Sequence, residues 1–205
     1  MIGKLFRRTR PPAPALPEAE LARRLTDRAY QCTCCGTVLR AADGAVRPEA
    51  PFGWKNPPDA KDDETFELGY MEMLTQSYAR RDGNFLVRAF LPIPVIGTES
   101  EVFLGVWASL SSGHHARFRS LQARGEAQTL GEQLSWLYTQ VPPISGPLLT
   151  KGTLVPYSDG RTPLYWITDE KHPFFAAQRD GMRAGDILDL YEVMGCEEMV
   201  KHLKA

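Results

Sequence analysis

Three cysteines in one short segment have the spacing that most directly predicts chemistry. Cys32 and Cys35 form a C-x-x-C pair, which lets two thiolates bind one Zn²⁺, and Gly36 permits the tight turn of a zinc knuckle. One knuckle supplies only half of a structural zinc site, so further ligands have to come from elsewhere in the chain. The candidates for these positions are Cys34, Cys196 and His172. We therefore predict a metal site that uses Cys32, Cys35 and His172.

Two other interpretations of the cysteines stay open. A redox pair has the same spacing, but such a motif normally begins a helix after a strand in a βαβ unit, and the sequence shows no such unit. Structural thiols without a metal are the leading alternative.

His172 also has two interpretations. It precedes Pro173, which holds the histidine backbone extended and places its imidazole at the start of a helix. There the ring can cap backbone amides or bond to Asp169, and we favour this capping role over metal binding. In a metal-dependent enzyme, Asp82, Asp169 or Glu170 would act as the acid or base.

No other segment carries a catalytic motif. The chain lacks a G-x-S-x-G elbow, a G-x-x-x-x-G-K-[ST] phosphate loop, a G-x-G-x-x-G fingerprint and an H-E-x-x-H pair. His114 and His115 are adjacent at a predicted helix start, so we expect an exposed pair rather than a site. Core packing accounts for the prominent aromatic residues, which are Phe90, Phe103, Trp107, Trp136 and Trp166.

Composition indicates an ordinary globular protein. Of the 205 residues, 43% are hydrophobic and 24% are charged, and the formal charge of −1 gives no field to hold nucleic acid. The uneven cysteine spacing fits a reduced compartment, and the sequence has no signal-peptide core and no apolar run long enough to span a membrane. We therefore expect a cytoplasmic protein.

The elements that would position the cysteines form one domain after a short tail. Residues 1–16 are basic and proline-rich and predict a flexible arm, and residues 17–205 predict a single α+β domain. Helices are expected at 17–29, 114–124, 129–138, 173–181 and from 184 onward, and residues 41–65 are expected to form a long surface loop.

A central antiparallel β-meander packed by helices is the predicted architecture. Its strands are 71–78, 84–95 and 101–110, with a hairpin turn at Asp82-Gly83, and two short strands follow at 152–156 and 163–168. The residues predicted to be buried are Val87, Ile93, Phe103, Val106, Trp107, Leu110, Phe118 and Leu134.

Four ordered motifs resemble one bacterial family of unknown function, DUF2199. They are C-x-x-C-G at 32–36, N-F-L-V-R-A-F-L-P-I-P-V-I-G-T at 84–98, G-V-W-A-S-L at 105–110 and H-P-F-F-A-A-Q-R-D-G at 172–181. The resemblance covers residues 30–181 and implies no activity. Family members often place a histidine shortly after the C-x-x-C-G, where this chain has Leu39, and this chain adds Cys34. If that histidine is a metal ligand, this chain has lost or replaced it.

Two hypotheses about function follow. The first is a non-catalytic binding or interaction domain, such as a regulator or an immunity-type protein, with a structural zinc and an unknown protein or small molecule as its partner. The alternative is a metal-dependent hydrolase that uses the Cys32, Cys35 and His172 region. The missing catalytic signatures favour the first hypothesis.

Overall fold

The computed structural model describes residues 16–39, 66–69, 72–139, 149–158 and 160–205. Their elements follow in chain order: α1 (Glu18–Thr26), β1 (Phe66–Gly69), β2 (Glu72–Leu74), β3 (Tyr78–Arg81), β4 (Asn84–Pro94), β5 (Glu101–Leu110), α2 (Ser112–Gln122), the 3₁₀ helix η1 (Ala127–Leu130), β6 (Gln133–Leu137), β7 (Thr150–Val155), β8 (Leu164–Ile167), α3 (Pro173–Asp180), α4 (Ala184–Val193) and α5 (Glu197–Lys204).

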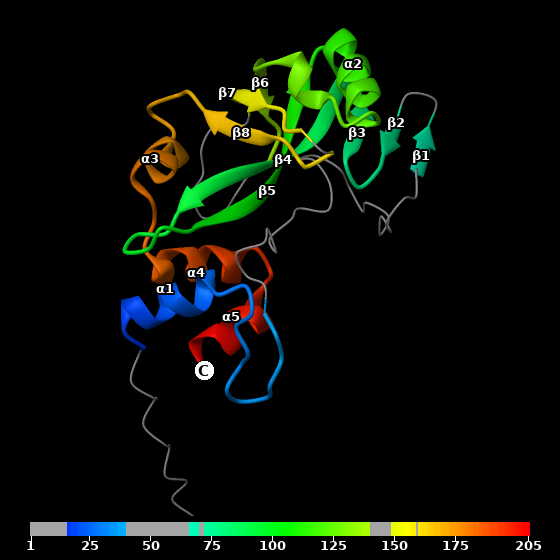
Figure 1. Cartoon of the computed structure of the whole chain (residues 1–205). Coiled ribbons are helices and arrows are strands. Elements are labelled where there is room, and N and C mark those ends of the chain that lie inside the picture. Colours follow the sequence, from blue (N-terminus) through cyan, green and yellow to red (C-terminus); the bar gives the residue numbers. More distant parts are fainter. Residues whose placement is uncertain (1–15, 40–65, 70–71, 140–148, 159) are drawn as a thin grey trace, which may run out of the picture.

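The last five strands close into a mixed barrel (Figure 1). Each strand from β4 to β8 pairs antiparallel with the next one along the chain. The ring closes where β8 lies parallel to β4, with Phe90 opposite Leu164 and the Phe90 amide donating to the Pro163 carbonyl at 2.8 Å. Strands β1 to β3 extend the sheet beyond β4.

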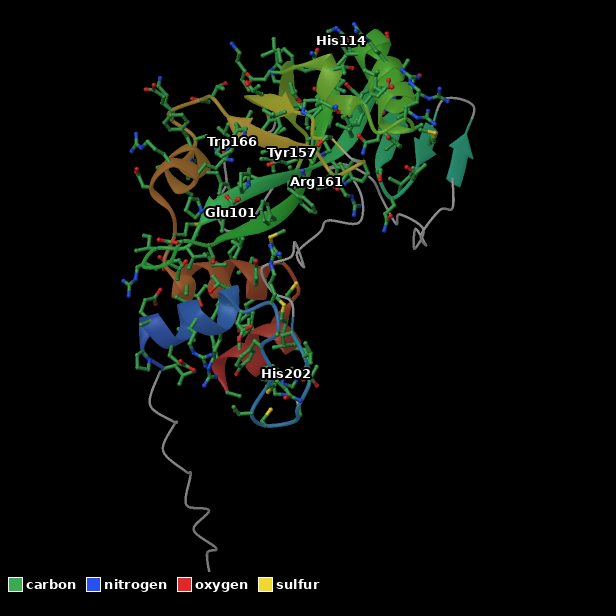
Figure 2. All side chains as sticks on the ribbon, viewed as in Figure 1. Glu101, His114, Tyr157, Arg161, Trp166 and His202 are labelled. Atoms are coloured by element: carbon green, nitrogen blue, oxygen red, sulfur yellow. The ribbon has the colours of Figure 1, made fainter. Side chains whose placement is uncertain are left out.

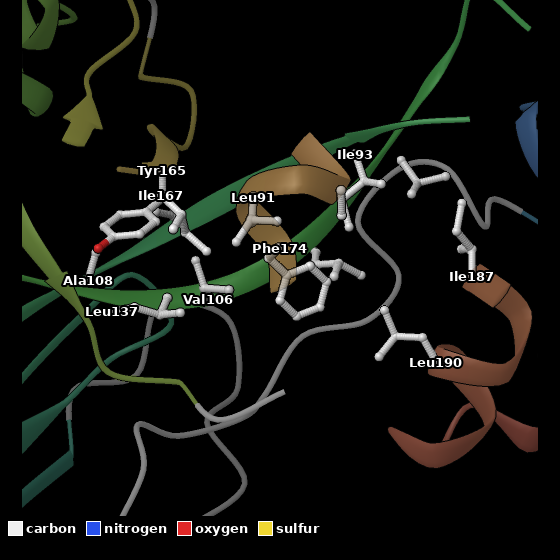
Figure 3. Close-up of a cluster of buried hydrophobic side chains, with 14 of the residues drawn as sticks. Leu91, Ile93, Val106, Ala108, Leu137, Tyr165, Ile167, Phe174, Ile187 and Leu190 are labelled. Atoms are coloured by element: carbon white, nitrogen blue, oxygen red, sulfur yellow. The ribbon is translucent and has the colours of Figure 1, made fainter. Parts of the chain in front are cut away.

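The core follows the alternation of the two long strands. From Val87 onward, every second residue of β4 is buried. Each lies opposite a buried residue of β5, as Leu91 lies opposite Leu104. Inside the barrel, Tyr165 is fully buried and its hydroxyl donates to the Thr150 carbonyl at 2.8 Å. Figure 3 shows this apolar cluster continuing past Phe174 of α3 toward α4.

A layer of three helices, α1, α4 and α5, packs at one end of the long strands (Figure 1). After α3 the chain pairs with the end of β4, where the Met182 amide donates to the Pro94 carbonyl at 2.9 Å, and this pairing fixes the start of α4. Arg24 of α1 is buried and donates to the Leu203 carbonyl at 3.1 Å, which ties α1 to the end of α5. The N-terminal helix predicted at 17–29 is therefore confirmed, although it ends earlier, at Thr26.

The predicted meander is confirmed in its two long strands and in its antiparallel pairing. Its first strand was placed too early, because β3 spans Tyr78–Arg81 and only two residues, Asp82 and Gly83, form the turn to β4. Both turn residues have positive φ angles, of 50° and 76°, as an Asp-Gly hairpin turn requires. The predicted helix that ends at Gly181 is also confirmed.

The helix predicted at 129–138 was wrong. A 3₁₀ turn ends at Gly131, whose φ is +69°, and β6 follows. The spacing of Leu130, Leu134 and Leu137 fits a helix, but pairing with β5 and β7 imposes a period of two. Leu134 consequently points outward and is 57% exposed, so its predicted burial was also wrong. Phe103 is only half-buried, whereas the other residues of the set predicted to be buried are buried. Core packing does not account for Trp136 and Trp166, because both side chains are exposed.

Two expectations fall outside the described residues. These are the loop at 41–65 and nearly all of the arm at 1–16. Among the residues that the structure describes, no helix is long and apolar enough to cross a membrane.

Candidate metal centre

The three cysteines lie in a tight hairpin between Tyr30 and Leu39. The Cys32 amide donates to the Thr37 carbonyl and the Gly36 amide donates to the Cys32 carbonyl, both at 2.8 Å. Gly36 has a φ of +76°, a left-handed conformation that glycine adopts without steric cost. This turn folds the chain back so that the side chains of Cys32 and Cys35 are on the same side as that of Cys34.

Helix α5 brings a histidine to the hairpin. His202 Nδ1 lies 3.4 Å from Cys32 Sγ, 3.5 Å from Cys34 Sγ and 3.6 Å from Cys35 Sγ. Figure 2 shows His202 in this part of the molecule, away from the barrel. Val200 and Leu203 of the same helix are buried in the core, and this packing fixes the side of α5 from which His202 projects.

The four ligand atoms form a group that could bind a metal ion such as zinc. All of them lie within 4.8 Å of one another. A tetrahedral zinc with ordinary bond lengths places its nitrogen about 3.6 Å from each sulfur and its sulfurs about 3.8 Å apart. The nitrogen–sulfur distances match these values, whereas Cys32 Sγ and Cys34 Sγ are 2.9 Å apart and would have to separate on binding.

A carboxylate lies beside the second ring nitrogen of the histidine. His202 Nε2 lies 3.3 Å from Glu198 Oε1, one helical turn earlier on α5. If Nε2 carries the proton and donates it to Glu198, Nδ1 keeps its lone pair and faces the three sulfurs. Metal-binding histidines almost always have such a partner on the second ring nitrogen. The contact between Nε2 and Glu198 is of the kind that a metal-binding histidine makes.

The thiols differ in acidity. The hydrogen bond with Cys32 raises the pKa of Cys34 to about 11. Hydrogen bonds with Thr37 lower the pKa of Cys35 to about 7, and Cys35 Sγ lies 3.1 Å from Thr37 Oγ1. Cys35 therefore carries more thiolate than Cys34 near neutral pH, and thiolate is the form that binds a metal.

The structure places the predicted ligands in two regions. Cys32 and Cys35 join the group together with Cys34, whereas His172 does not belong to it. His172 begins α3, where its Nδ1 accepts a hydrogen bond from the Phe174 amide at 3.2 Å, as the capping interpretation predicts. Cys196 precedes α5 and packs against the apolar core.

The predicted acid and base residues also lie elsewhere. Asp82 is in the exposed turn between β3 and β4. Asp169 Oδ1 accepts from the Lys171 amide at 3.0 Å in the turn before α3, and Glu170 is exposed in the same turn. None of the three belongs to the group of the cysteines and His202.

The expectation of an exposed histidine pair was wrong for His115. His114 is exposed, but His115 is buried, and its ring packs nearly perpendicular to the Tyr78 ring and tilted against the Phe85 ring. Burial and the charge of Arg119 lower the pKa of His115 to about 4. The ring is therefore a neutral core residue.

A family model for uncharacterised bacterial proteins, DUF2199, matches residues 31–182. The chain belongs to the DUF2199 family. No curated protein and no solved structure matches the chain. The matched range of this DUF2199 protein contains the three cysteines and ends before α4, so His202 comes from outside it.

The sequence contained only a weak signal for His202. Glu198 and His202 are four residues apart and therefore lie on one face of a helix. However, 170 positions separate His202 from Cys32, and only the packing of α5 brings the two together.

Proposed function

We propose that this protein is a non-catalytic binding domain whose Cys32, Cys34, Cys35 and His202 hold a structural zinc ion. One observation carries the proposal: three sulfurs and one ring nitrogen lie within 4.8 Å of one another, and the nitrogen–sulfur distances match those of a tetrahedral zinc site. Structural zinc sites use four protein ligands, whereas catalytic sites keep one position for water or substrate. A cytoplasmic location, where thiols stay reduced, suits this ligand set.

An exposed apolar surface supports the binding half of the proposal. Leu134 and Trp136 point outward from β6, and Trp136 is 41% exposed. Trp166 of β8 is 37% exposed and lies opposite Thr153, which in turn lies opposite Leu134. Exposed aromatic residues that lie together on one sheet face are typical of surfaces that contact another molecule.

The alternative, a metal-dependent hydrolase, has less support. It needs an open coordination position and an acid or base beside the metal. Here protein atoms account for all four positions, and Asp82, Asp169 and Glu170 are not members of the group.

Metal analysis of protein purified under reducing conditions tests the proposal. We expect roughly one zinc ion per chain in the wild type and loss of the metal in Cys35→Ser and His202→Ala. Cys196→Ser and His114→Ala are matched controls, because they remove a thiol and an imidazole outside the group, and both should retain the metal. Wild-type protein that neither contains nor takes up zinc would overturn the proposal.

Cobalt substitution separates the structural site from the catalytic one. A closed site with three thiolates and one histidine gives the strong visible bands of tetrahedral cobalt, together with thiolate charge-transfer bands. Added azide should leave this spectrum unchanged, because no ligand position is exchangeable. A spectrum that azide changes would indicate an open position and favour the hydrolase.

A further inference from the structure

A pocket of about 460 Å³ lies on the outer surface of the barrel, at the closure between β4 and β8. Its apolar wall consists of Phe90 of β4 and Phe103 of β5, whose ring centroids are 5.8 Å apart and whose planes are inclined by 51°. Both side chains are only half-buried, so part of each ring faces the pocket. Such a wall accepts a flat apolar group.

The opposite rim is the connection between β7 and β8, which contributes Tyr157 and Arg161. The guanidinium carbon of Arg161 lies 4.6 Å from the centre of the Tyr157 ring. Gln122 of α2 donates to the Gly160 carbonyl at 2.6 Å and holds this connection in place. Figure 2 shows Tyr157 and Arg161 close to each other beside the barrel. The cation is therefore positioned before any ligand arrives.

The charged side chains among the described lining residues are those of two arginines. Arg28, from the segment between α1 and the cysteine hairpin, is the second arginine that lines it. Among the described lining residues there is no carboxylate, and no described carboxylate forms an ion pair with Arg161. Arginine at the edge of an apolar pocket favours a carboxylate or a phosphate, which its planar fork can bind through two hydrogen bonds.

We propose that this pocket binds a small planar molecule that carries one anionic group, either a phosphate or a carboxylate. The ring system would lie against Phe90 and Phe103, and the anion would be bound by Arg161. The volume falls within the range of about 300 to 1,000 Å³ that is typical of small-molecule sites. The inference rests on the binding half of the proposed function, for which it names a ligand class, and does not depend on the metal.

Calorimetric titration of the full-length, metal-loaded protein tests the ligand class. The probes are AMP, which combines a ring and a phosphate, and 1-naphthoate, which combines a ring and a carboxylate. Binding of either probe supports the proposal and identifies the preferred anion. Adenosine and inorganic phosphate each lack one half of the ligand and should bind at least roughly tenfold more weakly. No binding of either ring-containing anion at millimolar concentration would overturn the proposal, as would phosphate that binds as tightly as AMP.

Two substitutions place the ligand in the pocket. Arg161→Gln removes a surface charge and Phe103→Ala removes an aromatic wall, and each should weaken binding of the preferred probe by roughly tenfold. The matched controls are Arg179→Gln and Phe85→Ala, since neither residue lines the pocket. If Phe103→Ala fails to fold, Arg161→Gln still decides the question. Unchanged affinity in Arg161→Gln would overturn the proposal, and the zinc content of each sample distinguishes this result from failure of the metal site.

Discussion

The barrel and the cysteine hairpin are stabilised by different physical interactions. Inside the barrel, side chains such as Leu91, Val106 and Tyr165 are fully buried, and hydrogen-bonded strands surround them. In the hairpin only Cys32 of the cluster is buried, Cys34 and Cys35 are exposed, and Val38 is 56% exposed. The hairpin therefore buries too little apolar area to hold its shape by packing alone, and metal–ligand bonds would supply the missing stability.

Among the described residues, the two ends of the hairpin connect it to the core. Tyr30 and Leu39, at the ends of the hairpin, pack against the main core. Arg24 lies 5.5 Å from the Tyr30 ring and bonds to Glu20 at 2.7 Å and to the Leu203 carbonyl. Loss of the metal should therefore loosen the hairpin and α5 while the barrel stays folded.

The largest expected loss of stability comes from a substitution in the barrel. Trp107 of β5 is fully buried, and the guanidinium of Arg88 lies 4.8 Å from its ring. Trp107→Ala should lower the free energy of unfolding by about 3 to 5 kcal/mol, because it leaves a large cavity. Urea denaturation measures this loss. Trp136→Ala is the control, since Trp136 is partly exposed, and similar losses in both variants would contradict the assigned burial.

The second-largest expected loss of stability comes from the cysteine hairpin. Cys35→Ser or chelation should destabilise the protein by about 3 kcal/mol when free zinc stands about a hundredfold above its Kd. Hydrogen exchange should show lost protection at 30–39 and in α5 but unchanged protection in β4 and β5. Cys196→Ser is the control. Equal loss of protection in β4 and β5 would show that the two regions unfold as one unit.

The sequence predicted the parts of the fold that local pattern determines. Alternating residues from Val87 to Ile93 specify β4, Asp82-Gly83 specifies its turn, and Gly181 ends α3. It did not predict β6, because the leucine spacing between Leu130 and Leu137 fits both a helix and a strand until a partner strand pairs with it. The closure of the barrel was not predicted either, because the parallel pairing of β8 with β4 joins residues that are far apart in the chain.

Only part of the candidate site could be predicted from the sequence. C-x-x-C spacing is a local signal, so Cys32 and Cys35 could be identified from the sequence. His202 could not, because the orientation of its ring depends on how α5 packs against α1. His172 was a reasonable alternative, since a histidine before a proline stands at a helix start whether it binds a metal or a backbone amide.

A smaller effect is expected when the contact between Glu198 and His202 is removed. Glu198→Gln removes the carboxylate that orients His202 and should weaken zinc affinity by about 10- to 100-fold. A competition titration with a chromophoric chelator measures the affinity. Glu197→Gln is the matched control, because it removes the same charge from the same turn of α5. Equal affinity in both variants would mean that Glu198 does not orient the histidine.

A fall in pH should destabilise the barrel, because His115 is held neutral in the folded protein. Burial and Arg119 lower its pKa to about 4 from the ordinary histidine value of 6.5, so the unfolded chain takes up the proton first as pH falls. Stability is therefore lost between about pH 6.5 and pH 4, and we expect a loss of about 1 kcal/mol between pH 7 and pH 5 after allowance for solvent screening. Urea titrations at both pH values measure it. The loss should be smaller in His115→Gln, and an identical pH dependence would contradict this assignment.

The smallest expected effect concerns His172, the sequence-predicted ligand that the structure places at a helix start. Burial lowers its pKa, so the ring stays neutral and Nδ1 can accept the hydrogen bond from the Phe174 amide.

Replacement of this histidine by asparagine keeps a side-chain acceptor for the same bond, whereas replacement by alanine removes it. We therefore expect His172→Asn to be more stable than His172→Ala by about 0.5 to 1 kcal/mol. Thermal and urea denaturation measure the difference. Both variants should keep the wild-type zinc content, because the four ligands come from the hairpin and α5. Zinc loss in both variants would instead make His172 a ligand and would displace His202 from that role.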